Sequence, residues 1–122
     1  MKIYKEFFFD AAHFLPYAED GHPNRRMHGH SFRTVVWLKG KPAAQTGMVR
    51  HFEDVEHALM AVREKLDHHL LNEIEGLEFP TLERIASWIW HKLATPLPEI
   101  MRVEVHRASC REGCVYDGPE NE

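Results

Sequence analysis

The spacing of apolar residues changes from a strand-like to a helix-like period near the middle of this chain, and that change limits the folds that it can adopt. Residues 2–13 alternate around a Phe-rich stretch, and residues 30–38 are rich in β-branched and aromatic side chains, so both segments are predicted to be strands that pair with each other. After a turn segment at residues 40–47, apolar residues recur at steps of three and four over residues 52–66, which is typical of an amphipathic helix. The first half of the chain is therefore expected to supply two strands and then a helix.

The second half of the chain adds another helix and then returns to strands. Thr81 follows Pro80 and is a good helix N-cap, and the apolar face of this helix continues to Leu93. Residues 103–106 and 114–116 are predicted to form a closing hairpin. The order strand, strand, helix, helix, strand, strand indicates an α+β fold, with two helices packed on one face of an antiparallel sheet. Because the other face must be polar or covered, we expect an oligomer to bury it.

The composition is that of an ordinary folded domain. With 122 residues, 43% of them hydrophobic and 28% charged, the chain is expected to form one domain spanning residues 1–122. The formal charge of −4 at pH 7 and the scattered Lys and Arg residues argue against a nucleic-acid partner. No apolar run reaches the roughly 20 residues that span a bilayer, and no signal core is present, so no membrane partner and a cytoplasmic location are expected. The cysteines, Cys110 and Cys114, are too few for a disulfide framework and are expected to be reduced.

Histidines are the feature that points to chemistry. In His28-Gly29-His30 an extended backbone directs both imidazoles to the same side, about 7 Å apart at their Cα atoms, so both can reach one metal. His13 ends the first predicted strand after two small alanines, which leave room beside a metal. Three neutral imidazoles with an open fourth position are typical of catalytic zinc. The alternative is that these are surface or turn histidines.

A second cluster, Asp67-His68-His69, follows the first predicted helix. A carboxylate beside a histidine fixes its tautomer and raises its basicity, as in many proton-transfer pairs. The alternative is a capped helix end with solvated histidines.

The chain resembles the 6-pyruvoyl-tetrahydropterin synthase and 6-carboxytetrahydropterin synthase family along nearly its whole length. It is most similar to the bacterial 6-carboxytetrahydropterin synthases of queuosine biosynthesis. The segments that carry the resemblance are Phe9-Asp10-Ala11-Ala12-His13, His28-Gly29-His30-Ser31-Phe32, Leu66-Asp67-His68-His69-Leu70-Leu71-Asn72, Pro80-Thr81-Leu82-Glu83 and Cys110-Arg111-Glu112-Gly113-Cys114.

The resemblance implies a tunnelling fold (T-fold), in which subunits assemble into ring-like homo-oligomers, commonly hexamers, with active sites between subunits. It also implies a zinc ion held by His13, His28 and His30, which ligates the side-chain hydroxyls of the pterin substrate 7,8-dihydroneopterin triphosphate. Asp67 and His68 match the family's proton relay. Thr81 and Glu83 lie in the segment that matches the family's pterin pocket and are taken as substrate-binding residues.

Three positions depart from the family pattern. Asn24 stands where the family has a catalytic cysteine, and an amide cannot act as a thiolate-like base. Ala108 stands where counting back from Cys110 places the glutamate that anchors the pterin ring, and His51 stands where relatives often have Asp. We expect Asn24 to position a water or a substrate hydroxyl and Asp67 with His68 to supply the base.

Three functions fit this pattern. The first is a zinc-dependent lyase of the 6-carboxytetrahydropterin synthase type, acting on 7,8-dihydroneopterin triphosphate or a related pterin. The second is a diverged paralogue with a different lyase or aldolase activity on a pterin side chain. The third is a non-catalytic protein that binds zinc and a pterin.

Overall fold

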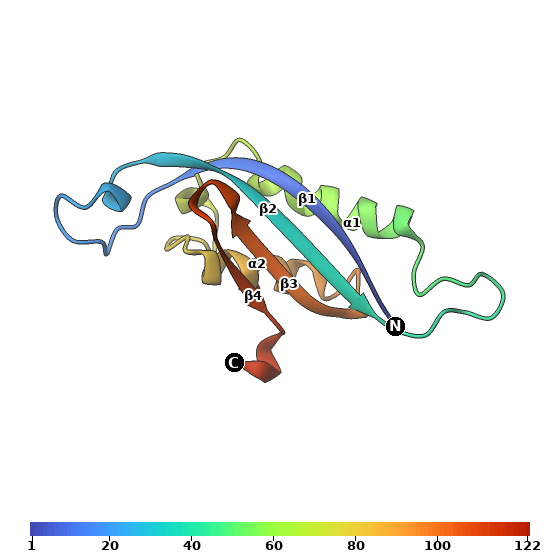
Figure 1. The fold of residues 1–122 in the computed structure, drawn as a ribbon. Coiled ribbons are helices and arrows are strands. Elements are labelled where there is room, and N and C mark those ends of the chain that lie inside the picture. Colours follow the sequence, from blue (N-terminus) through green and yellow to red (C-terminus); the bar gives the residue numbers. More distant parts are fainter.

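The computed structural model describes residues 1–122 as a four-stranded antiparallel sheet with two helices against one face (Figure 1). The strands lie side by side in chain order, so each pairs with the next. The elements are β1 (Lys2–His13), β2 (His28–Lys39), α1 (Phe52–Leu66), α2 (Leu82–Leu93), β3 (Ile100–Arg107) and β4 (Glu112–Tyr116). The predicted α+β order and the placement of both helices on one face are confirmed.

The β1–β2 hairpin is longer than the sequence predicts. β2 begins at His28, two residues before the predicted strand, and all twelve of its residues pair with β1, from Lys2 with Lys39 to His13 with His28. Pairing with β1 therefore extends the strand through Gly29, a residue with little strand preference of its own. As a result the whole His28-Gly29-His30 segment is held in a regular ladder.

The core fills the space between the sheet and the helices. Phe9 on β1 and Phe32 on β2 are paired across the hairpin and stack with ring centroids 4.8 Å apart. Burial of a side chain of this size contributes about 1.5–3 kcal/mol. Both helices present the apolar faces that their periodicity predicts; the buried residues on them are Val55, Leu59, Val62, Leu66, Leu82, Ile85, Ala86, Trp88, Ile89 and Leu93.

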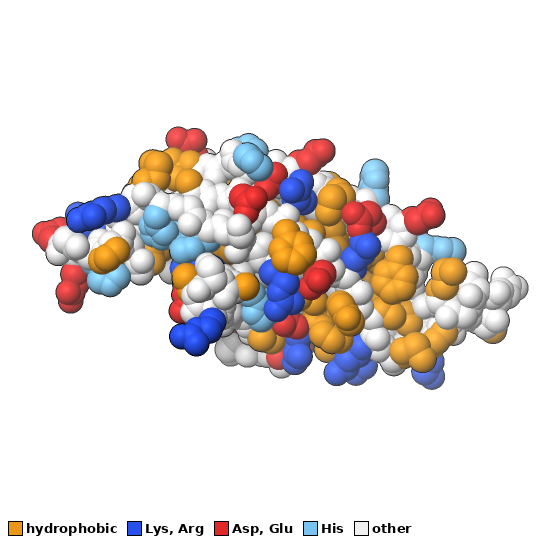
Figure 2. Space-filling model, turned by 45° about the horizontal axis from the view of Figure 1, so that its top comes forward, with side chains coloured by type: hydrophobic (Ala, Val, Ile, Leu, Met, Phe, Trp, Pro, Cys, Tyr) orange, Lys and Arg blue, Asp and Glu red, His pale blue; other side chains and the backbone are white.

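The face of the sheet that carries no helix is partly apolar. Tyr4 and Phe8 on β1 remain 56% and 57% exposed, and Trp37 on β2 lies against Tyr4 with ring centroids 4.8 Å apart. Ion pairs such as Arg33 with Glu6 lie among them. Figure 2 shows hydrophobic side chains interspersed with acidic and basic ones on the face that it presents. This mixed surface is open in the single chain.

Neither helix is long and apolar enough to cross a membrane.

Gly113 on β4 is fixed by a close neighbour across the ladder. It pairs with His106 on β3, and a Cβ at this position would collide with Nδ1 of His106 and lie 2.9 Å from its Cε1. His106 is itself held by Glu104, whose Oε1 lies 2.9 Å from its Nε2. We expect Gly113→Ala to lower the free energy of unfolding by about 1–3 kcal/mol, the usual effect of overpacking, as measured by urea denaturation.

Gly29→Ala is the matched control for that substitution. Its added Cβ would meet only the carbonyl oxygen of Ala11, at an ordinary 3.6 Å. A Gly113→Ala variant as stable as Gly29→Ala would contradict the packing constraint.

Candidate metal centre

Three histidines meet at the end of the β1–β2 hairpin. His13 pairs with His28, and Ala11 pairs with His30, so strand alternation places all three imidazoles on the helix-facing side of the sheet. One ring nitrogen from each lies within 4.8 Å of the others. His13 is only 1% exposed, which is unusual for a surface or turn histidine. The structure therefore brings together the three residues predicted as metal ligands.

Hydrogen bonds fix the tautomers of two of these histidines. Nδ1 of His13 lies 2.9 Å from the carbonyl oxygen of Pro80, and Nδ1 of His28 lies 2.7 Å from the carbonyl oxygen of Arg26. Because a carbonyl oxygen only accepts, both Nδ1 atoms must donate, and in a neutral ring Nε2 then carries a lone pair. The two Nε2 atoms nevertheless lie only 3.0 Å apart. Two facing lone pairs at this distance are stabilised by a cation between them.

His13 does not readily supply this positive charge by becoming protonated. Burial lowers the pKa of His13 to about 4, and the neighbouring charges of His28, His30 and Arg107 act in the same direction. Burial, followed by the charge of Arg107, also lowers the pKa of His30. Nε2 of His30 is buried and has no hydrogen-bond partner. Buried nitrogen lone pairs on neutral imidazoles are the donors that zinc prefers, so this residue set fits the metal.

Asp67 and His68 are hydrogen-bonded to the backbone of Asp10 on β1. Asp67 ends α1, and its Oδ1 accepts a hydrogen bond of 2.9 Å from the backbone N–H of Asp10, while the N–H of His68 donates to the carbonyl oxygen of Asp10. Oδ2 of Asp67 accepts from Nδ1 of His68 at 2.8 Å. The Asp10 N–H and then the His68 side chain lower the pKa of Asp67. The carboxylate thus holds His68 in the tautomer whose Nε2 is free to accept a proton.

His68 itself is exposed and adopts an uncommon backbone conformation. Its φ is 59°, in the left-handed region, and its side chain is 79% exposed. A cleft of about 540 Å³ lies beside the β1–β2 hairpin, and both His30 and His68 line it. No hydrogen bond joins His68 to the three histidines. Within one chain His68 is therefore a neighbour of His30 in this cleft and not its hydrogen-bond partner.

Asn24 lies in the loop between β1 and β2, in a short 3-10 turn at Pro23–Arg25. Its backbone N–H donates to Nδ1 of His22 at 3.0 Å, and its carbonyl oxygen accepts from Leu15. Its half-buried side chain makes no hydrogen bond within the chain. The amide is therefore free to bind a ligand or water, and its role stays a prediction.

The other predicted substrate residues lie at the start of α2 and at the β3–β4 turn. Glu83 lies in the first turn of α2 and lines a small pocket with Arg107, Glu112 and Cys114. Ala108 is exposed in the turn that follows β3 and does not line this pocket. Arg107, the last residue of β3, lines it instead. Alternation after the buried Val103 and Val105 is the sequence signal that places Arg107 on the helix-facing side.

Thr81 has a structural role at the N-terminus of α2. Its Oγ1 accepts a hydrogen bond of 3.2 Å from the backbone N–H of Arg84. We expect Thr81→Ala to lower the free energy of unfolding by about 1 kcal/mol, because this N–H loses its cap. Thr81→Ser keeps the hydroxyl and should unfold at nearly the wild-type urea concentration. Equal stability of the alanine and serine variants would contradict the capping role.

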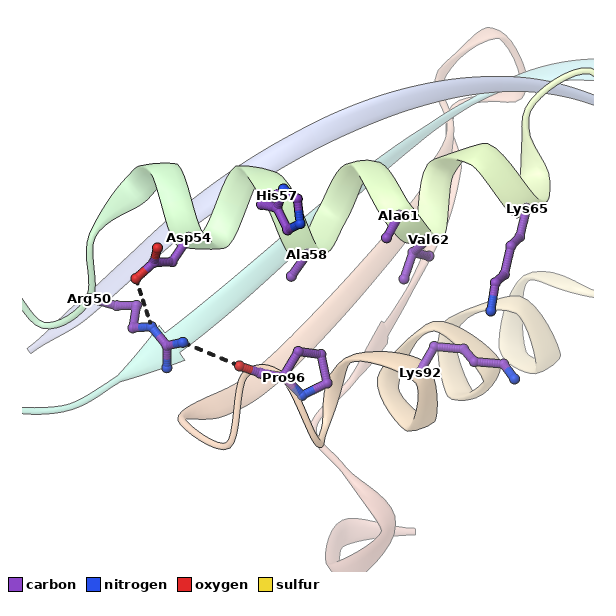
Figure 3. Close-up of a pocket in the computed structure, with 9 residues that line it drawn as sticks. All are labelled: Arg50, Asp54, His57, Ala58, Ala61, Val62, Lys65, Lys92 and Pro96. Carbon is purple, nitrogen blue, oxygen red and sulfur yellow. Dashed lines mark hydrogen bonds and ion pairs between the residues drawn. The ribbon is translucent and has the colours of Figure 1, made fainter.

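A separate basic cleft of about 500 Å³ lies between α1 and α2 (Figure 3). Lys65 and Lys92 extend toward it from the two helices, whereas Arg50 is tied to Asp54 and to the carbonyl oxygen of Pro96. None of the predicted site residues lines this cleft.

Three imidazoles at the end of a strand hairpin, one buried and two half-buried, lie near a carboxylate–histidine pair and define a candidate metal-dependent enzyme centre on an α+β scaffold. Residues 2–119 match the family model described as 6-pyruvoyl tetrahydropterin synthase. The chain therefore belongs to the 6-pyruvoyl tetrahydropterin synthase family, whose members process pterins.

Individual relatives in this family differ in their reactions. The chain is 42% identical to a 6-carboxy-5,6,7,8-tetrahydropterin synthase from Synechocystis sp., over 96% of this chain and 93% of the relative. It is 34% identical to a dihydroneopterin monophosphate aldolase from Pyrococcus furiosus, over 86% of this chain and 83% of the relative. The human 6-pyruvoyl tetrahydrobiopterin synthase is 29% identical to this chain, over 80% of this chain and 68% of the relative.

The fold agrees with this assignment. A 6-pyruvoyl tetrahydropterin synthase structure from Caenorhabditis elegans matches with a TM-score of 0.84 at 21% identity, over 97% of this chain and 95% of that one. The expected T-fold is confirmed.

Proposed function

We propose that this protein is a zinc-dependent lyase of the 6-carboxytetrahydropterin synthase type, which acts on the side chain of 7,8-dihydroneopterin triphosphate. The observation that carries the proposal is the pair of Nε2 atoms of His13 and His28 held 3.0 Å apart, with their Nδ1 atoms both donating to carbonyl oxygens. With His30 they form a neutral three-imidazole donor set. Zinc bound there would acidify a substrate hydroxyl as a Lewis acid.

The protein groups around the histidines set their orientation. The carbonyl oxygens of Pro80 and Arg26 hold the rings of His13 and His28 with Nε2 toward the shared position. Such outer hydrogen bonds fix the tautomer of a metal ligand and raise its basicity. Pro80 also precedes α2, so the start of this helix and the metal centre are held together.

Asp67 and His68 would supply the proton transfer. Nδ1 of His68 donates to Asp67, so Nε2 of His68 accepts a proton from substrate while the carboxylate stabilises the resulting imidazolium. In each chain the exposed Nε2 of His68 is not bonded to the three histidines, which fits the expectation that neighbouring subunits of a ring-like homo-oligomer share each site. The exposed Tyr4 and Phe8 would then lie at contacts between subunits.

Mixing two inactive variants tests the shared site. His30→Ala removes a metal ligand and His68→Ala removes the base, so each alone should be inactive. If a site takes its histidines from one subunit and its base from another, co-refolded mixtures should regain part of the wild-type turnover. If each chain has its own complete site, the mixture stays inactive.

The second candidate is an aldolase that cleaves a dihydropterin side chain. Two observations favour it: Asn24 stands in place of the cysteine, and the dihydroneopterin monophosphate aldolase of Pyrococcus furiosus is 34% identical to this chain. A zinc- and pterin-binding protein without activity remains the third candidate, and the intact hydrogen bond between Asp67 and His68 argues against it.

Product analysis separates the three candidates. Zinc-loaded protein is incubated with 7,8-dihydroneopterin triphosphate, and separately with the monophosphate, and the products are identified by mass spectrometry. A 6-carboxytetrahydropterin with acetaldehyde and released triphosphate supports the lyase. A 6-hydroxymethyl pterin with a two-carbon aldehyde supports the aldolase. Unchanged substrate in both incubations would overturn both enzymatic candidates.

A further inference from the structure

The side-chain amide of Asn72 bonds to the backbone beside the metal centre. Its Oδ1 accepts from the backbone N–H of Phe14 at 3.0 Å. Its Nδ2 donates to the carbonyl oxygens of Phe14 at 2.9 Å and Glu78 at 3.3 Å. Because an N–H only donates and a carbonyl oxygen only accepts, these partners fix which end of the amide is oxygen and which is nitrogen. The half-buried Asn72 side chain is therefore held in one orientation.

The amide of Asn72 replaces a strand partner for the residue that follows His13. The end of β1 lies beside the segment after α1, where the N–H of Ala12 donates to the carbonyl oxygen of His69 at 3.1 Å. The next residues of that segment form a short 3-10 turn that is hydrogen-bonded within itself. At Phe14 the Asn72 side chain offers one acceptor and one donor, as a neighbouring peptide would. The backbone on both sides of His13 is thus bonded to one segment.

The same amide contacts the segment that orients the imidazole ring of His13. Glu78, which accepts from Asn72, lies two residues before Pro80. The carbonyl oxygen of Pro80 lies 2.9 Å from Nδ1 of His13, in a buried contact. One side chain therefore connects the backbone next to a metal ligand with the segment that holds the ring of that ligand. Outer hydrogen bonds of this kind tune metal affinity, because they fix where the ligand lone pair points.

We propose that Asn72 is a positioning residue of the metal centre, which holds Nε2 of His13 toward the position shared with His28 and His30. It is not a ligand, because its oxygen and nitrogen are used by backbone groups. It fixes the buried imidazole of His13 in its binding orientation before the ion arrives. This inference rests on the proposed function, because it takes the three histidines to hold zinc. A purely structural role would lower the stability of the fold and leave zinc affinity unchanged.

Asn72→Asp tests these hydrogen bonds with a side chain of the same shape. Aspartate still accepts from the N–H of Phe14, but its carboxylate cannot donate to the carbonyl oxygens of Phe14 and Glu78. The zinc affinity is expected to fall by about tenfold, as measured by competition with a chromogenic chelator. An added negative charge would by itself attract the cation, so a loss of affinity reports the lost bonds. Asn72→Ala removes all of the bonds and should lose at least as much.

Trp88→Phe is the matched control for the Asn72 variants. The indole Nε1 of Trp88 donates to the carbonyl oxygen of Glu75 at 3.1 Å, so it also holds the segment between α1 and α2. This bond does not involve Phe14 or the metal histidines. The control variant is expected to unfold at a lower temperature while it binds zinc with the wild-type affinity.

Cobalt(II) in place of zinc gives a second measurement, which also serves for a variant that folds only with metal bound. Its visible absorption spectrum depends on the number and arrangement of its ligands. A displaced His13 ring should change this spectrum in both Asn72 variants. The spectrum of Trp88→Phe should match that of the wild type.

The possible outcomes distinguish this inference from the proposed function. Wild-type protein that binds zinc, with Asn72→Asp equal to it in zinc affinity and cobalt spectrum, would overturn the inference alone. Equal losses of zinc affinity in Asn72→Asp and Trp88→Phe would also overturn it, since they would show a general effect of loop stability. Wild-type protein that binds no zinc would overturn the proposed function and the inference with it. Weaker zinc binding and a changed cobalt spectrum, both confined to the Asn72 variants, are the result that the positioning role predicts.

Discussion

His30→Ala is expected to lose bound zinc and, with it, all measurable turnover. Its buried Nε2 is one of the three ring nitrogens that meet at the centre, and two imidazoles alone bind zinc far more weakly than three. We expect the zinc content of purified protein to fall from about one ion per chain to near zero, with an affinity loss of more than about 100-fold. His30 is a better target than His13, which is 1% exposed and whose loss would also leave a cavity in the core.

His57→Ala is the matched control for the metal centre. His57 lies on α1 beside the basic cleft and outside the three-histidine group. The control variant should retain zinc and activity. A His30→Ala protein with full zinc content and wild-type turnover would contradict the assignment of His30 as a ligand.

His68→Ala is expected to abolish most of the turnover while leaving zinc in place. Removal of a general base typically costs about 10²- to 10⁴-fold in rate. The effect should appear in kcat, with zinc content and thermal stability unchanged, because the His68 side chain is exposed and bonds only to Asp67. Steady-state kinetics and metal analysis of the same preparation measure both quantities.

Asp67→Asn tests whether the two residues act as a unit. Asparagine still accepts the Asp10 N–H but no longer supplies a negative charge to His68. If the residues form one relay, the double variant should be scarcely slower than His68→Ala. His91→Ala, an exposed histidine on α2, is the control and should be fully active. Turnover that is unchanged in His68→Ala would contradict the relay.

Local patterns were sufficient to predict the main helices and strands and the common orientation of His28 and His30. The helical periodicity of residues 52–66 matches α1, and Thr81 is the N-cap of α2 as its position after Pro80 indicates. His28 and His30 needed only strand alternation to face the same way. The start of β2 was harder to predict from the sequence, because Gly29 has little strand preference of its own. Pairing with Ala12 extends the strand through this residue.

The parts of the site that depend on distant contacts were not visible in the sequence. Asp67 is tied to Asp10, 57 residues away, and His13 to Pro80, 67 residues away, and no local pattern reports either bond. The residue that lines the pocket between the start of α2 and the β3–β4 turn was also not visible in the sequence. Counting from Cys110 selects Ala108, but β3 ends at Arg107 and the chain then turns, so the side chain that enters the pocket depends on where the strand stops.

Dependence of turnover on zinc tests the central claim most directly. Protein is assayed with 7,8-dihydroneopterin triphosphate as purified, after removal of metal by a chelator, and after zinc is added back, with products identified by mass spectrometry. The three-histidine centre predicts product from the purified protein, none after chelation, and recovery of the original rate at one zinc per chain. Turnover that continues unchanged in metal-free protein would contradict it.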